Sequence, residues 1–196
     1  MRKLISVLGI AALALAAGNP ASAWVRCDFL TGGGFIVRDS GAKGTFAIGG
    51  SCRPGGDGHG LWGHLEYHDH GTGLNVHWLT ITAYIDGGDT STDPKTHQPT
   101  GTRIICGTAR TNQFGDVDWA VKAKDVGEPG VDDEFVIKLS QGGVTVYNTL
   151  HDSNDTLGGT GPGGGNIQLH KENPSITESF TALNPTTCPA FFATPS

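Results

Sequence analysis

The chain has 196 residues, of which 31 are glycine, 10 are proline and 4 are cysteine, and its formal net charge at pH 7 is −6. The glycines follow no three-residue period, which excludes a collagen-like protein, and a hydrophobic share of 37 % is enough to build a core. The negative charge argues against a nucleic-acid binder, because such proteins present a basic face to the phosphates.

The first 23 residues have the three parts of a secretory signal peptide. Arg2 and Lys3 precede an apolar run over residues 4–17, and residues 21–23 have the A-x-A form of a cleavage site. This run is too short for a transmembrane helix, which needs about 20 apolar residues. We therefore expect cleavage after Ala23, a bacterial host, a mature chain without an integral membrane segment, and a secreted or periplasmic location.

Beyond residue 23, short runs rich in β-branched and aromatic residues alternate with glycine-bearing turns, and no useful helical stripe is present. Residues 86–101 and 151–164 are predicted to be loops. We predict strands at 25–30, 33–38, 44–49, 61–70, 74–85, 102–111, 117–125, 133–140, 143–150 and 165–170.

The clearest strand pattern covers residues 61–70. Leu61, Leu65 and Tyr67 fall on one face and alternate with polar or larger residues on the other, which is typical of a half-buried strand. A glycine turn then leads into residues 74–85, where both faces are fairly apolar. We expect this second strand to be central in its sheet.

Glycine and proline mark two further hairpins. Pro129 and Gly130 suit the turn before residues 135–139, and Gly142-Gly143 joins that strand to the next one. Consecutive hairpins indicate an antiparallel meander. We predict an all-β domain over residues 24–171 that forms a β-sandwich or barrel, followed by an irregular, proline-rich strap over residues 172–196.

All four cysteines lie beyond the predicted cleavage site, and an even number in an exported chain predicts two disulfides. No C-x-x-C pair is present, so a metal ribbon is excluded. Three pairings exist for four cysteines, and sequence alone does not choose among them. We favour Cys27–Cys188, which would tie the two ends together, with Cys52–Cys106 inside.

Histidines gather on the polar face of the strand predicted at 61–70. This face carries His64, Glu66, His68 and His70, and His77 follows just after the turn. Imidazole and carboxylate groups that converge could hold zinc or copper. The alternative is a polar outer face rich in histidine, because alternate residues on a strand lie about 6–7 Å apart, too far for three neighbours to bind one ion readily.

Carboxylates crowd two of the predicted turns. Calcium takes six to eight oxygen ligands, so the turn that contains Asp125 and Asp133 is a candidate calcium site. Neither turn matches the EF-hand pattern. The alternative is that these are solvated turn residues, because Asp side chains also bond to the backbone of turns. The first turn carries Asp125, Glu128, Asp132 and Asp133, and the second carries Asp86, Asp89 and Asp93.

The chain lacks the sequence signals of the best-known enzyme classes. It contains no G-x-S-x-G, no H-E-x-x-H and no P-loop motif. Residues 58–63 and 159–164 match G-x-G-x-x-G, but neither match opens a helix in a βαβ unit. These absences favour a protein that is not an enzyme.

Several segments, taken in order, resemble a family of secreted bacterial β modules, the post-COAP domain family. The likeness covers roughly residues 30–171, and it is found at 32–36, 61–67, 69–74, 107–112, 125–130, 132–135 and 163–170. The polar positions that match are Asp69, His70, Glu128, Asp132 and Asp133. The resemblance implies an exported all-β module and assigns no catalytic residue. The family often has an apolar residue where this chain has His68, which speaks against a shared three-histidine metal site.

These observations favour a secreted, non-enzymatic β module that binds an extracellular or periplasmic ligand or has a structural role. The second hypothesis is a metal-dependent enzyme or metal-binding protein that uses the face from His64 to His77. The third is a calcium-stabilised adhesion module. The sequence identifies neither the ligand nor a cofactor, for which a divalent metal ion is the candidate.

Overall fold

The structure is a computed structural model of the chain, and it describes residues 27–52, 61–150, 152–161, 163–173 and 188. The predicted signal peptide at 1–23 lies outside the described residues, as does the predicted strap apart from residues 172, 173 and 188. The described residues form strands and turns and no helix. Accordingly, this part of the chain contains no helix long and apolar enough to cross a membrane.

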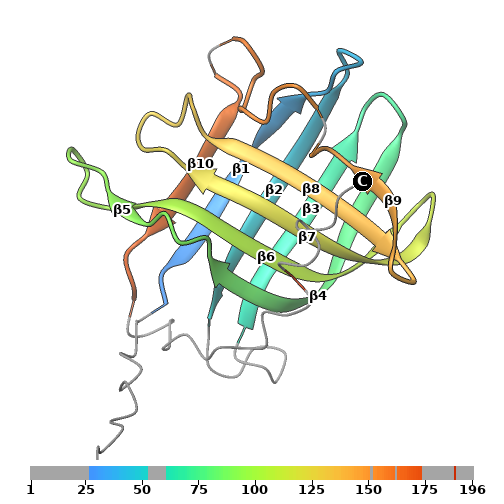
Figure 1. Cartoon of the computed structure of the whole chain (residues 1–196), viewed down its shortest axis with the longest axis horizontal. Helices are drawn as coiled ribbons and strands as arrows, with labels where there is room; N and C mark the ends of the chain where they lie inside the picture. The colour runs from blue at the N-terminus through green and yellow to red at the C-terminus, as the bar shows by residue number, and fades with distance from the viewer. Residues whose placement is uncertain (1–26, 53–60, 151, 162, 174–187, 189–196) are drawn as a thin grey trace, which may run out of the picture.

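Ten strands make one antiparallel sheet. They are β1 (Phe29–Val37), β2 (Lys43–Cys52), β3 (Leu61–Asp69), β4 (Leu74–Asp86), β5 (Ser91–Thr92), β6 (Pro99–Thr111), β7 (Gly115–Asp125), β8 (Glu134–Gln141), β9 (Val144–Asn148) and β10 (Gly165–His170). Their order is β10-β1-β2-β3-β4-β6-β7-β8-β9, with β5 paired to β6. The predicted meander is confirmed, and β10 returns to lie beside β1 (Figure 1).

Two predictions about the strands are wrong. Residues 29–37 form one strand rather than two, and β5 lies within the predicted loop at 86–101. The glycines at 32–34 do not turn the chain but pair with both β2 and β10. A Cβ on Gly34 would lie 2.2 Å from the carbonyl oxygen of Gly164. Glycine therefore marks a close approach of two backbones at this point.

The sheet curls at β4 into a half-barrel. Strand β4 has two register shifts against β6, between Trp78 and Thr80 and between Ile81 and Ala83. Such bulges bend a strand and increase its twist. Figure 1 shows the result, with β4, β6, β7 and β8 crossing in front of β10, β1, β2 and β3.

The core lies between the two halves of the curled sheet. The side chains of β3 alternate as predicted, with Leu65 and Tyr67 buried inside and Glu66 exposed outside. The rings of Phe46 on β2 and Phe135 on β8 stack with their centroids 3.8 Å apart. Strands far apart in the order of the sheet therefore meet across its interior.

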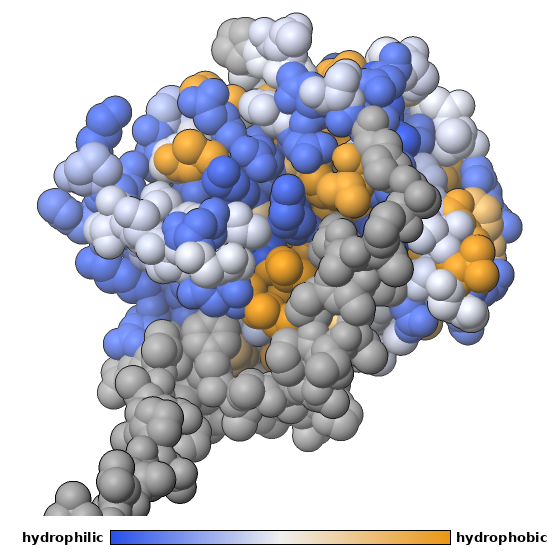
Figure 2. Space-filling view, in the orientation of Figure 1, coloured by the Kyte–Doolittle hydropathy of each residue, from blue (hydrophilic) through white to orange (hydrophobic). Residues whose placement is uncertain are grey.

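The outer surface is mainly polar. Figure 2 shows hydrophilic residues over much of the face that Figure 1 turns to the viewer, with apolar residues in separate patches. Scattered apolar residues of this kind are ordinary on a protein surface. The exposed large apolar side chains of the described residues are Trp62, Leu79, Val126, Val131 and Val144.

The predicted disulfide pairing is wrong. The bonds are Cys27–Cys52 and Cys106–Cys188, with Cα atoms 5.8 Å and 6.0 Å apart. Cys27 precedes β1 and Cys52 ends the neighbouring strand β2, so their side chains meet in the interior. Cys106 faces outward from β6 and packs with Cys188 in a separate small cluster. The predicted Cys52–Cys106 bond would have to connect opposite faces of the sheet.

We predict that peptide mapping under non-reducing conditions will recover one cross-linked peptide containing Cys27 and Cys52 and another containing Cys106 and Cys188. Cys27 and Cys52 lie close together because β1 and β2 are adjacent antiparallel strands. Recovery of a Cys27–Cys188 peptide would contradict the strand order described above.

Gly107 offers a test of packing between β4 and β6. A Cβ there would lie 1.9 Å from the carbonyl oxygen of Thr80 and 2.9 Å from the ring of Trp119, which is 1 % exposed. We expect Gly107→Ala to lower the free energy of unfolding by about 1–3 kcal/mol, as overpacking does. Urea unfolding followed by circular dichroism measures this loss.

Gly33→Ala is the matched control, because the nearest atom to a Cβ at Gly33 lies 3.4 Å away. This contact is ordinary, so the change should stay within about 0.5 kcal/mol. Equal effects of the two substitutions would show that the close contact at Gly107 is not formed.

Candidate functional site

The histidine face predicted from the sequence lies on the outer side of β3 and β4. Nδ1 of His77 donates a hydrogen bond to Oε1 of Glu66 across the two strands. The rings of His68 and His70 stack with centroids 4.3 Å apart. His64 instead lies beside Trp62 in an edge-to-face arrangement, with centroids 6.1 Å apart.

These side chains do not form one ligand set. Among the described residues, no three His, Cys, Asp or Glu side chains are placed so that they could hold a metal ion. The predicted metal site, composed of His64, Glu66, His68, His70 and His77, is therefore not formed. These side chains form separate pairs instead, with Glu66 bonded to His77 and His68 stacked on His70.

The acidic turn predicted to bind calcium has a structural role. One edge of strand β10 is hydrogen-bonded to β1. On its other edge, the backbone N–H groups of Ile167 and Leu169 point away from β1. Oδ2 of Asp133 accepts the N–H of Ile167, and Oδ2 of Asp125 accepts the N–H of Leu169, both at 2.7 Å. Two carboxylates thus occupy the place of a neighbouring strand.

The remaining oxygens of these two carboxylates hold their own turn. Oδ1 of Asp133 accepts the N–H of Val126 at 2.9 Å, and Oδ1 of Asp125 accepts the N–H of Gly127 at 2.7 Å. Each carboxylate therefore connects the β7–β8 turn to β10. Carboxylates bonded to backbone amides in this way have both oxygens committed to the fold.

The other two acidic residues of this turn do not share the amides that Asp125 and Asp133 bond. Asp132 is exposed, and Oε1 of Glu128 accepts a hydrogen bond from the side-chain amide of Asn166 at 3.2 Å. The four predicted calcium ligands do not converge on one point, and the described residues hold no acidic group of three suited to a cation.

The second acidic turn is also bonded to its own backbone. Asp89 accepts the N–H and the hydroxyl of Thr102, at 2.7 and 2.8 Å. Asp93 accepts the amides of Lys95 and Thr96, both at 2.7 Å. These bonds match the alternative that the sequence suggested, in which Asp side chains shape the turns.

A buried network holds the other edge of the sheet. Arg38, which follows β1, donates to Asp69 at 2.8 Å and also bonds to Asp152 and Tyr147. The hydroxyl of Tyr147 donates to Asp69 at 2.7 Å and lies 2.6 Å from the hydroxyl of Tyr67. This network connects edge strand β9 to β1 and β3.

The electrostatics of Asp69 fit a structural role. Burial by itself would raise the pKa of Asp69, which is 2 % exposed, but the bonds from Tyr147 and from the amides of Gly71 and Thr72 outweigh it. Together with the charge of Arg38, these bonds hold the pKa of Asp69 below its usual value.

A second buried network lies where β1 begins. Nε of Arg103 donates to Asp28 at 3.0 Å, and Nη1 donates to Thr90 at 2.9 Å and to Asp86 at 3.3 Å. The hydroxyl of Tyr84 donates to Asp28 at 2.7 Å. Because a buried charge needs such partners, this network is part of the fold.

The polar positions of the post-COAP resemblance do not share a cleft. Asp69 and His70 lie where β3 turns into β4, whereas Glu128 and Asp133 lie where β7 turns into β8. Pairing along β4, β6 and β7 puts these two turns at opposite ends of the strands.

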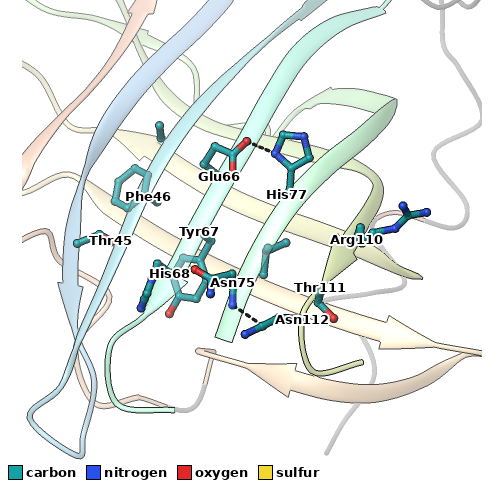
Figure 3. A pocket seen from close by; sticks show the side chains of 12 residues that line it. Thr45, Phe46, Glu66, Tyr67, His68, Asn75, His77, Arg110, Thr111 and Asn112 are labelled. Carbon is teal, nitrogen blue, oxygen red and sulfur yellow. Dashed lines mark hydrogen bonds and ion pairs between the residues drawn. The ribbon is translucent and has the colours of Figure 1, made fainter. Parts of the chain in front are cut away.

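A groove of about 540 Å³ lies over β2, β3, β4 and β6 (Figure 3). The polar side chains that line it include Glu66 and His68 on β3, Asn75 and His77 on β4, and Arg110 on β6. Figure 3 shows Glu66 and His77 pointing toward each other across the groove. Three of the five residues of the predicted histidine face therefore line this groove, namely Glu66, His68 and His77.

Four ionisable side chains lie side by side in the register of the groove strands. Glu66 pairs with His77, His77 with Arg110, and Arg110 with Asp116 on β7. Glu66 is hydrogen-bonded to His77, and Arg110 and Asp116 form an ion pair at 2.9 Å. The arginine of the groove thus has an acidic partner beside it.

Small side chains on β2 leave a shallow trough beside β3. Thr45, Ala47 and Gly49 alternate along the outer face of β2, and the first two line the groove. A Cβ on Gly49 would lie 2.8 Å from Cε1 of His64, so the His64 ring lies directly against this glycine. The absence of a side chain at Gly49 lets the ring lie flat there.

One end of the groove is held by an asparagine in the β6–β7 turn. The side-chain oxygen of Asn112 accepts the backbone N–H of Asn75 at 2.8 Å, and its amide donates to the carbonyl of Gly73 at 2.9 Å. No sequence pattern marked Asn75, Arg110 and Asn112 as site residues. Strict alternation places Arg110 outward, but its position beside His77 depends on the register of β4 with β6.

Comparison with known protein families, curated proteins and solved structures finds no match for this chain. The function is therefore argued from the groove and from the roles of the side chains around it.

The buried carboxylate of Asp133 gives a prediction about pH. Burial raises the pKa of Asp133 to about 6, and the nearby charges of Asp125 and Glu128 act in the same direction. The value in an unfolded chain is 3.8, so the folded protein binds the extra proton between these two pH values. Protonation of Asp133 therefore stabilises the fold as the pH falls.

We expect the free energy of unfolding of the wild type, measured relative to Asp133→Asn, to rise by about 1 kcal/mol between pH 7.5 and pH 5. Urea unfolding at both pH values measures this difference. The comparison with the variant is needed because burial lowers the pKa of His170, which opposes Asp133 in the same range.

Asp132→Asn is the control, because Asp132 is exposed beside Asp133. It should follow the wild-type pH profile. A profile for Asp133→Asn that runs parallel to the wild type would contradict the buried, amide-bonded carboxylate.

Proposed function

We propose that the protein is a secreted, non-enzymatic β module that binds a ligand in the groove over β2, β3, β4 and β6. One observation carries the proposal. The buried charged clusters around Asp133, Asp69 and Arg103 are bonded within the fold, whereas four polar side chains of the groove are exposed on its outer face, namely Glu66, Asn75, His77 and Arg110. A concave site with a few convergent polar groups is the usual form of a ligand site.

The proposal is for binding rather than catalysis. Glu66 and His77 form an acid–base pair, but no hydroxyl or thiol of the described residues is hydrogen-bonded to His77. Nucleophilic catalysis needs such a group within hydrogen-bond reach of the base. The groove thus offers recognition groups without the nucleophile that would complete a catalytic set.

The disulfides and the predicted signal peptide also support the proposal. The two disulfides are consistent with an oxidising compartment outside the cytoplasm, which agrees with the signal peptide predicted at residues 1–23. The resemblance to the post-COAP family favours the same kind of exported module. We further propose that the fold is closer to a barrel than to a sandwich, because one continuous sheet builds both of its halves.

We expect small molecules to bind in the groove rather than elsewhere on the described surface. The measurement is a map of amide chemical shifts in ¹⁵N-labelled protein titrated with a monosaccharide, a nucleoside, an amino acid, a fatty acid and zinc chloride. At least one organic probe should shift amides around Glu66, His77 and Arg110.

Two controls sharpen this titration. Val144→Thr alters a side chain that is 67 % exposed on the far edge strand β9, and it should leave the map unchanged. His77→Gln should weaken the shifts in the groove. Shifts caused by stoichiometric zinc alone, or organic probes that bind only elsewhere, would overturn the proposed function.

A further inference from the structure

We propose that the ligand of the groove is an uncharged glycan chain, which lies along the outer face of β3 and stacks a sugar ring on the indole of Trp62. This inference rests on the proposed function and adds the class of ligand. It depends on four features of the outer face, which are an exposed indole, a row of planar polar groups, balanced charge and a trough of small residues.

The exposed indole is the first feature. Trp62 is 37 % exposed, and it is the only aromatic residue among the large apolar side chains exposed in the described part of the chain. Trp119, in contrast, fills the core and is 1 % exposed. An indole that remains at the surface presents a large, rigid apolar face together with one N–H donor. The apolar face of a sugar ring, formed by its C–H groups, matches this surface.

The orientation of the ring also favours stacking. The ring of His64 meets Trp62 edge-on, at an interplanar angle of 79°. Both rings lie close to Gly49, whose Cβ position would be 2.8 Å from His64 and 3.4 Å from Trp62. Contacts with Gly49 and with the nearly perpendicular ring of His64 restrict the indole, so less conformational entropy is lost when a ligand binds.

A row of polar groups continues from the indole along the strand. Trp62, His64, Glu66 and His68 are successive outward residues of β3, so the row is about 20 Å long. The later part of this row lines the groove, where Asn75 faces it from β4. Imidazole, carboxylate and amide groups offer both donors and acceptors. Sugar hydroxyls also donate and accept, so a chain of linked sugars can bond along the whole row.

The balance of charge favours an uncharged ligand. Arg110 is the one arginine or lysine among the groove residues, and it is paired with Asp116, while Glu66 is hydrogen-bonded to His77. A site for phosphate, sulfate or carboxylate groups would present basic side chains free to bond to the anion. A ligand rich in hydroxyl groups can bond to these ion pairs without separating them.

The trough on β2 distinguishes a glycan from an extended peptide. A peptide that adds a strand needs a free backbone edge. Strand β2 pairs with β1 on one side and with β3 on the other, so the floor of the trough has no such edge. The small outward side chains of Thr45 and Ala47 leave space above the sheet for a flat chain of rings, whereas the space at Gly49 holds the His64 ring.

Affinity electrophoresis in native gels tests the inference. The probes are neutral polymers (dextran, xylan and glycol chitin), the anionic polymer polygalacturonate, and bovine serum albumin in the gel as a polypeptide probe. We expect at least one neutral polymer to retard the protein, and a soluble oligosaccharide of the same type to change its tryptophan fluorescence.

Variants of the indole give the decisive comparison. Trp62→Ala should weaken retardation about tenfold or more, in line with the loss of an aromatic stacking surface. Trp62→Phe should restore part of it, because a ring remains. Leu79→Ala is the matched control, since Leu79 is an exposed apolar residue of β4 outside the groove, and it should bind as the wild type does. Thermal unfolding of each variant checks that the fold is retained.

The outcomes separate the inference from the proposed function. If small probes bind in the groove but no neutral polymer retards the protein, the glycan inference is wrong and the proposed function stands. Retention by polygalacturonate or albumin alone would also overturn the inference, in favour of an anionic or polypeptide ligand. Glycan binding that Trp62→Ala leaves unchanged would place the site elsewhere, as would oligosaccharide shifts of wild-type amides outside β2, β3 and β4.

Discussion

The hydrogen bonds from β10 to two buried carboxylates are the interaction on which the curled sheet depends. A sheet with an open edge leaves a row of backbone amides without partners, and proteins normally cover or pair such edges. Here Asp133 and Asp125 accept the amides of Ile167 and Leu169, so the edge is satisfied without another strand. Burial raises the pKa of both carboxyl groups above the usual value, because it disfavours their charged form.

The opposite edge follows the same logic with a different set of side chains. Arg38, Asp69 and Tyr147 connect β9 to strands across the interior, so both ends of the sheet are held by side-chain bonds. These buried charged groups therefore stabilise the fold. The outer face of β3 and β4, which we propose for recognition, instead carries exposed polar groups such as Glu66, Asn75 and His77.

Glycine contributes to both the core and the outer face. Within the core, Gly107 leaves room for Trp119, and outside, Gly49 leaves room for the rings of His64 and Trp62. The sequence analysis expected glycine chiefly at turns, and that holds for Gly142-Gly143, where both residues have positive φ. Inside the strands the reason is different, because a neighbouring ring or backbone occupies the position of a side chain.

Local sequence was sufficient to determine the class of the fold and most of its strands, because alternation and turn residues act over a few positions, as in residues 61–70. It also separated the two faces of β3 correctly. Only the tertiary structure decided what lies beside each face. The register of β4 with β6 brings Arg110 next to His77, and the order of the strands pairs Cys27 with Cys52. The return of β10 turns Asp125 and Asp133 into backbone partners rather than ion ligands, because the amides that they bond come from residues more than 30 positions away in the chain.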